Sequence, residues 1–231
     1  MLVVAAAVAL IIPAVASVQR GSDIRDFQKD VGQTKTICGR VVTYDYPGKD
    51  GSGDCSLRLD IGGPYWNPAF YVLIKPASGS VPAADAYLAQ EVCATGNVES
   101  DKKHVPFIAI NGGKGLEIKN GTLAPPLVQG AVPACEAGIM PPKLTKEVKP
   151  HYPEDEFHQR AQARDHSPEL VFLQAVIDET GRVRACRTVY SRSRSFGFAA
   201  ETALKEWRFT PAIRGGTPVS VVVQIEMKFT L

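Results

Sequence analysis

The last thirteen residues of the chain alternate between two kinds of side chain, and this pattern constrains the fold more than any other stretch. One parity is apolar, and the other is mostly polar, with Ser220, Gln224, Glu226, Lys228 and Thr230. Such alternation predicts a β-strand with one buried face and one open face. A strand of this length exceeds the usual range of about 3–10 residues. We therefore expect it to overhang its neighbours and to leave backbone groups free to pair with another chain.

The residues before this strand predict two helices and a hairpin. Residues 154–164 carry acidic side chains at their start and arginines at their end, which suits a helix dipole. Residues 169–178 and 183–190 alternate like strands around a turn, "DETGR". Ser195 is placed to cap a second helix, whose apolar residues recur at helical spacing up to Trp207. The prediction is an α+β domain with a three-stranded antiparallel sheet and two helices on its apolar face.

A proline-rich stretch divides the chain. Residues 122–142 contain five prolines and little charge, which is typical of an extended linker. It separates residues 22–121 from residues 143–231. The chain is long enough for two such domains.

The first of these parts shows short strands between turns. The expected strands are residues 36–44, 55–62, 70–74, 91–98 and 105–110, with a short helix at 84–90. Three strands, a helix and two strands are the element order of the OB-fold, a small five-stranded barrel. The stretches "TICGRVV", "CSLRLDIGGPYWNPAF" and "EVCATGNV" also resemble OB-fold domains of exported bacterial proteins. The fold class is therefore multi-domain: an all-β OB-fold-like barrel followed by an α+β domain.

Strand parity predicts one disulfide among the five cysteines. Cys38 and Cys93 each lie on the side of their strand opposite its apolar residues. The first and fourth strands of an OB barrel are neighbours, so these two thiols can meet on one outer face. Two free thiols are the alternative, and the pairing of Cys55, Cys135 and Cys186 is left open.

The N-terminal segment, residues 1–17, predicts export. It carries no charge and ends in Ala14-Val15-Ala16, the small-x-small pattern of a signal-peptide cleavage site. Cleavage is expected close to Ser17, and the mature protein is then periplasmic. The alternatives are a short uncleaved anchor in the inner membrane, which would be the only membrane contact, and a buried helix.

Composition and motifs argue against several function classes. Residues 22–121 hold 11 Lys and Arg against 12 Asp and Glu, so the aromatic side chains there (Tyr44, Tyr46, Tyr65, Trp66 and Tyr71) lack the basic groove of a nucleic-acid site. His151, His158 and His166 do not have the spacing of a helical metal site. No nucleophile elbow or phosphate loop occurs, so we expect no catalytic residues, no metal, no cofactor and no enzyme activity.

The C-terminal part resembles a known family. Its segments "KPHYPEDE", "VIDETGRVRACRTVYSRS" and "AAETALKEWRFTPAIRGGTPVSVVVQIEMKF" look like the C-terminal domain of TonB-family proteins. The resemblance implies a periplasmic domain in energy-coupled transmembrane transport. Its partner is a TonB-dependent transporter of the outer membrane, which pairs a short segment as an added strand on the final strand. The residues expected to bind this partner are Tyr152, Pro153, Val222, Gln224, Glu226 and Lys228.

Two departures from the family leave a second reading open. The strand after the first helix begins "HSPELVF" instead of with the usual Gly-x-Val, and a folded domain fills the place of the long spacer. The alternative is an exported OB-fold ligand-binding protein whose TonB-like domain is a structural module or forms a homodimer. A pull-down with and without residues 218–231 separates the two readings.

Overall fold

The computed structural model describes residues 15–18, 25–46, 55–64, 67–76, 84–119, 127–164 and 167–230. Most of the expected signal or anchor segment lies outside these residues, as do Tyr65, Trp66, His166 and Leu231. No helix within the described ranges has the length and apolar character needed to cross a membrane.

Five strands close into a barrel in the N-terminal part: β2 (Thr34–Asp45), β3 (Leu57–Ile61), β4 (Phe70–Lys75), β5 (Glu91–Ser100) and β6 (Pro106–Asn111). Their order is β2-β3-β4-β6-β5, and β5 pairs with β2 to close the ring. β4 and β6 run parallel, and the other neighbours are antiparallel. The 3-10 helix η1 (Ala84–Tyr87) precedes β5. β2 pairs with β5 through its first half and with β3 through its second, so this one long strand links both sides of the ring.

Alternation along these strands fills the barrel with apolar side chains. Ile37, Leu59, Val72, Val92 and Ile108 are fully buried in one cluster. Three short elements extend the barrel: β1 (Val15–Val18) pairs parallel with β2, β7 (Leu116–Ile118) pairs with β5, and α1 (Arg25–Gln28) inserts one buried side chain.

Two disulfides connect elements of this part. Cys38 and Cys93 lie directly opposite each other in the β2–β5 pair and are bonded, which is the disulfide predicted from strand parity. The second disulfide joins Cys55, just before β3, to Cys135 in the segment between the domains. Cys186 is a free thiol.

The C-terminal part contains a mixed sheet in the order β12 (Val183–Tyr190), β11 (Glu169–Ile177), β16 (Val221–Phe229) and β8 (Val132–Pro133). The first three strands are antiparallel, as expected, and β8 adds a short parallel strand to β16. The helix α3 (Arg194–Lys205) packs on one face and buries Phe196, Ala200 and Leu204. Its N-cap is Ser193, not the expected Ser195; the Ser193 hydroxyl accepts from the Phe196 N–H, while Ser195 donates to Asp155.

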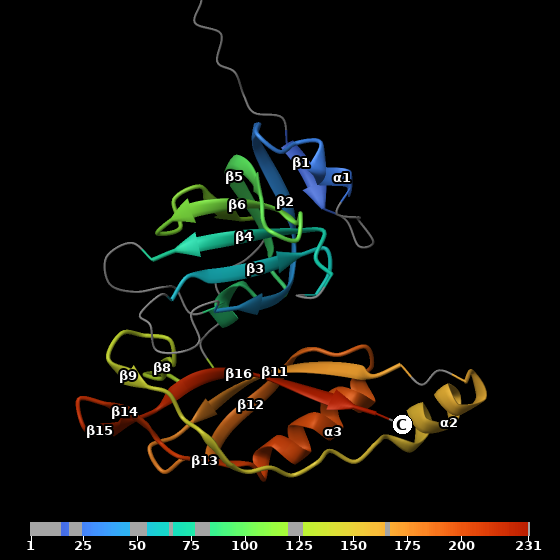
Figure 1. Cartoon of the computed structure of the whole chain (residues 1–231), viewed down its shortest axis with the longest axis vertical. Coiled ribbons are helices and arrows are strands. Elements are labelled where there is room, and N and C mark those ends of the chain that lie inside the picture. Colours follow the sequence, from blue (N-terminus) through green and yellow to red (C-terminus); the bar gives the residue numbers. More distant parts are fainter. Residues whose placement is uncertain are drawn as a thin grey trace, which may run out of the picture.

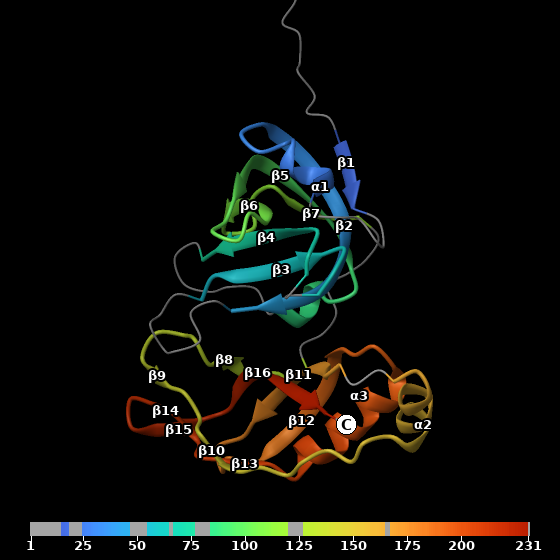
Figure 2. The same cartoon turned by 45° about the vertical axis from the view of Figure 1, so that its right-hand side comes forward.

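The helix α2 (Glu154–Gln162) lies beyond the end of the sheet (Figures 1 and 2) rather than on its apolar face, where it was expected. Its sequence offers little to bury, since Phe157 and Ala161 are its only apolar side chains. Phe157 remains about half exposed, at 47%. The apolar face under β16 is covered instead by the chain before α2, and the Trp207 indole donates to the Val148 carbonyl there.

Small pairings complete this part of the fold. β10 (Leu144–Lys146) pairs with β13 (Arg208–Phe209), and β14 (Ala212–Arg214) pairs with both β9 (Ile139–Met140) and β15 (Thr217–Val219). The predicted linker, residues 122–142, thus contributes two short strands, β8 and β9, to the C-terminal sheets.

The final strand is shorter than predicted and does not overhang. Ser220 separates β15 from β16, and its hydroxyl donates to Glu179. All nine residues of β16 are paired with β11, from Val221 opposite Ile177 to Phe229 opposite Glu169. The expectation of unpaired overhanging residues was therefore wrong, and any open backbone lies along the other edge of β16.

The barrel lies on the side of this sheet opposite α3 (Figures 1 and 2). The strand β11 is accordingly buried on both faces, with Leu173 and Ala175 toward the helix and Phe172, Gln174 and Val176 on the other side. The central strand of the C-terminal sheet is therefore enclosed between α3 and the barrel.

Candidate functional site

The outer edge of β16 is the feature that sequence analysis singled out. The Val132 N–H donates to the Ser220 carbonyl at 3.3 Å, and the Ala134 N–H donates to the Val222 carbonyl at 3.2 Å. These bonds show that the even-numbered residues of β16 turn their backbone groups away from β11, because backbone groups on a strand alternate in direction. β8 covers the edge only at Val221 and Val222.

Beyond β8 the edge is open within the described residues. Gln224, Glu226 and Lys228 continue the same parity, and no described strand pairs with them on that side. Each presents one N–H and one C=O outward. An uncovered edge of this kind is a template for an added strand.

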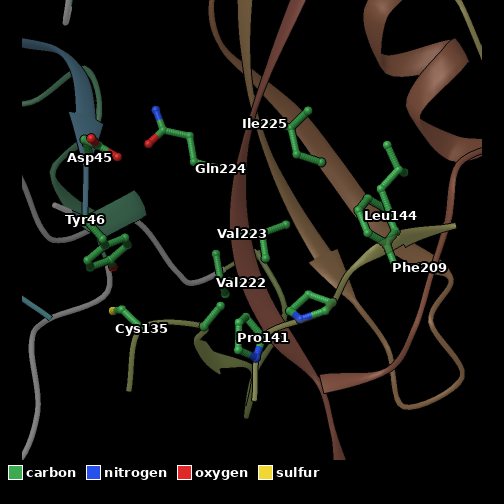
Figure 3. A pocket seen from close by; sticks show the side chains of 12 residues that line it. Asp45, Tyr46, Cys135, Pro141, Leu144, Phe209, Val222, Val223, Gln224 and Ile225 are labelled. Carbon is green, nitrogen blue, oxygen red and sulfur yellow. The ribbon is translucent and has the colours of Figure 1, made fainter. Parts of the chain in front are cut away.

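A cavity of about 300 Å³ lies directly beside the start of this open edge (Figure 3). It is lined by Asp45, Tyr46, Ala134, Cys135, Pro141, Pro142, Leu144, Phe209, Val222, Val223, Gln224 and Ile225. These residues come from the barrel, from the connecting segment and from the C-terminal sheet. The cavity is thus built by both domains.

One side of the cavity is polar and belongs to the end of β2. Asp45 and Tyr46 line it here, and the side chain of Gln224 extends toward Asp45 (Figure 3). The Gln224 Oε1 atom is buried and accepts no hydrogen bond from the described residues. Tyr46 is held by the Ala84 N–H, which donates to its hydroxyl.

The other side of the cavity is apolar. Leu144 and Phe209 are opposite each other in the β10–β13 pair, and Pro141 and Pro142 precede them. Leu144 is 44% exposed and the neighbouring Met140 is 58% exposed. Large apolar side chains are therefore available to a segment that lies along the edge.

The remaining predicted partner residues lie at the far end of β16. The Tyr152 ring packs edge-on against Phe196 at 5.3 Å and Phe229 at 6.1 Å between centroids. Pro153 is the N-cap residue of α2. The structure thus gathers Val222 and Gln224 at the cavity, leaves Glu226 and Lys228 exposed, and places Tyr152 in an aromatic cluster around the end of the strand.

A charged cluster flanks the same end of the sheet. Glu169 is buried between Arg160, at 3.7 Å, and the more exposed Arg192, at 4.0 Å. Burial raises the pKa of the Glu169 carboxyl, and the two arginines oppose that shift. Both arginines are therefore ion-pair partners of one buried carboxylate.

The barrel's share of the site was not predicted from the sequence. Tyr46 was considered only among the aromatic side chains that lack a basic groove, Pro141 lay in the predicted linker, and Asp45 was not singled out. The missing signal was the Cys55–Cys135 disulfide, which fixes the connecting segment next to the barrel. No group of three or more His, Cys, Asp or Glu within the described ranges is arranged to hold a metal ion.

Comparison with known proteins identifies the C-terminal domain. Residues 148–231 match the family model described as the Gram-negative bacterial TonB protein C-terminal. A solved structure, the solution NMR structure of the Pseudomonas aeruginosa TonB C-terminal domain, shares 27% identity over 39% of this chain and 86% of its own, with a TM-score of 0.30. No curated protein matches the chain. The match to the TonB C-terminal family therefore covers residues 148–231, the C-terminal part of this chain.

Proposed function

We propose that this chain is a non-enzymatic coupling protein whose C-terminal domain binds a transporter of the outer membrane by strand addition. The observation that carries the proposal is the open edge of β16 at Gln224, Glu226 and Lys228. Three outward N–H groups and three outward C=O groups can pair with an extended segment of the partner. The TonB C-terminal family match supports energy-coupled transport as the setting.

The proposal places the protein in the periplasm. The uncharged N-terminal segment predicts export, and two disulfides suit an oxidising compartment. Each disulfide closes a long loop, with separations of 55 and 80 residues, so both would be strong stabilising links where thiols stay oxidised.

We also infer that the barrel is an OB-fold. Its strand order β2-β3-β4-β6-β5, its parallel β4–β6 pair and the helix η1 before β5 support this assignment. The barrel would then hold the C-terminal domain at a fixed place, where proteins of the resembled family have a long spacer.

The test compares a proline with an alanine at one edge residue. Glu226→Pro removes an outward N–H, whereas Glu226→Ala removes only an exposed side chain. With a purified TonB-dependent transporter in nanodiscs, we expect Glu226→Pro to weaken binding at least tenfold and Glu226→Ala to change it by less than threefold. Hydrogen exchange checks that both variants stay folded. Normal binding by the folded proline variant would refute strand addition at this edge.

The alternative reading, a dimerising module, is tested in the same samples. Sedimentation equilibrium would show a dimer that dissociates in Glu226→Pro if two copies pair their β16 edges. A monomer that binds the transporter supports the proposal, and a dimer that binds none contradicts it.

A further inference from the structure

We infer that the barrel forms the second wall of the strand-binding site, and that Asp45 and Gln224 receive a basic side chain of the added strand. This inference rests on the proposed strand addition and goes further by stating the chemistry of the partner segment. It assigns a binding role to the N-terminal domain.

The geometry follows from the position of an added strand. A strand paired with Gln224–Lys228 runs about 4.8 Å outside β16 and enters the space occupied by the cavity. Its side chains point alternately to the two faces of the sheet. One face is the side of Asp45, Tyr46 and Gln224, and the other is the side of Leu144 and Phe209.

The barrel side is acidic. Asp45 is the one charged residue among those that line the cavity, and it is 7% exposed. Gln224 Oε1, a second acceptor, lies buried beside it without a donor from the described residues. Two acceptors in a largely apolar cavity favour a cationic donor, because a carboxylate shielded from water gains most from an opposite charge.

The opposite side selects apolar residues. Leu144, Phe209 and the two prolines present carbon surface to every second residue of the added strand. The partner segment that fits is therefore short and extended, with apolar residues on one side and at least one Lys or Arg on the other.

A short segment fits this edge better than a second copy of the chain. β8 already occupies Val221 and Val222, so the nine residues of another β16 cannot pair along their full length. The open run from Gln224 to Lys228 matches a segment of about five residues, and this length sets the probe.

The experiment uses two blocked, fluorescein-labelled peptides, acetyl-Val-Lys-Val-Lys-Val-amide and acetyl-Val-Glu-Val-Glu-Val-amide, with the full chain and fluorescence anisotropy. We expect the lysine peptide to bind at least tenfold tighter than the glutamate peptide. Asp45→Asn should reduce this ratio to threefold or less. The matched control is Glu99→Gln, which removes one exposed carboxylate from the barrel away from the cavity and should leave the ratio unchanged.

The results distinguish this inference from the proposed function. Loss of both peptides in Glu226→Pro with an unchanged ratio in Asp45→Asn would overturn the acidic wall and leave strand addition intact. An equal fall of the ratio in Asp45→Asn and Glu99→Gln would assign the preference to overall charge and overturn the inference. Failure of both peptides to bind, while the transporter binds normally, would overturn the stated partner chemistry alone.

Discussion

The two sheets of this protein differ in how they end. In the barrel, β2 pairs with both β3 and β5, so each of the five strands has a neighbour on both sides. In the C-terminal sheet, β16 has a full partner on one side and only the two-residue β8 on the other. The edges that β2 and β5 leave beside the ring are already paired with β1 and β7, while the outer edge of β16 is open beyond β8 among the described residues. The proposed strand-binding edge therefore belongs to the C-terminal domain, and the barrel supplies the proposed second wall of that site.

Removing the barrel's internal disulfide should have the largest effect. The Cys38–Cys93 bond closes a loop of 55 residues, for which chain entropy gives about 4 kcal/mol of stabilisation. The double variant Cys38→Ala with Cys93→Ala should lower the barrel's free energy of unfolding by about that amount. Hydrogen exchange should show faster exchange in the barrel peptides and little change in those of the C-terminal sheet. Equal acceleration in both would show that the two parts unfold as one unit.

A proline substitution should lower stability more in the closed barrel than on the open edge of β16. Leu73 in β4 has partners on both sides, Arg58 in β3 and Ala109 in β6. Leu73→Pro removes a ladder hydrogen bond and should cost about 3 kcal/mol. Leu73→Ala serves as the control for the side chain. Glu226→Pro on the open edge should cost less than about 1 kcal/mol, since its N–H points outward. Similar losses in thermal or urea unfolding would contradict the edge assignment.

A buried acid makes the barrel's stability depend on pH. Asp60 is fully buried, accepts hydrogen bonds from Thr43 and Arg58, and has a pKa that burial raises to about 6. A carboxyl whose pKa is higher in the folded state favours folding when protonated, so its contribution falls as pH rises from about 4 to about 6. Two pKa units correspond to about 3 kcal/mol at most. Urea unfolding of wild type and Asp60→Asn at pH 4 and pH 7 measures the difference.

The C-terminal part contains a carboxyl group whose pKa shifts in the opposite direction. The pKa of the exposed Asp155 is lowered, mainly by the hydrogen bond from Ser195. Its small contribution is present at neutral pH and is lost as pH falls through the lowered pKa.

A wild-type barrel that gained stability from pH 4 to pH 7, relative to Asp60→Asn, would contradict the assignment for Asp60.

The smallest effect concerns the helix of the open-edged domain. Ser193 caps α3, so Ser193→Ala should lower the stability of this domain by about 1 kcal/mol. Ser195→Ala, the cap expected from sequence, should cost less because Ser195 bonds only an exposed carboxylate. The reverse order in thermal unfolding would favour the original expectation.

Patterns among residues close in sequence predicted much of the fold. Period-two alternation placed Cys38 and Cys93 on one outer face, and the same logic separated the inward residues of β16 from Gln224, Glu226 and Lys228. These features depend on residues close in sequence and on one strand pairing. The predicted helices also formed, although α2 has too few apolar residues to hold a place on the sheet.

The site between the domains could not be predicted in this way. β8 reads Val-Pro, a pair with weak strand character, and it pairs with β16 because the chain around it is fixed at Cys135. That disulfide joins residues 80 apart, and no local pattern indicates its partner. The length and register of β16 depended likewise on β11, whose nine residues match it fully.

The Cys55–Cys135 bond has a mechanical consequence. If tension is applied between the barrel and the β16 edge, the load passes through sulfur rather than through the 80 residues that separate the two cysteines. At about 3.5 Å per residue, the bond removes roughly 280 Å from the length to which the backbone could be drawn out. A pull on β16 would then reach the barrel after very little extension, so the connection acts as a short, stiff coupling in which slack is almost absent.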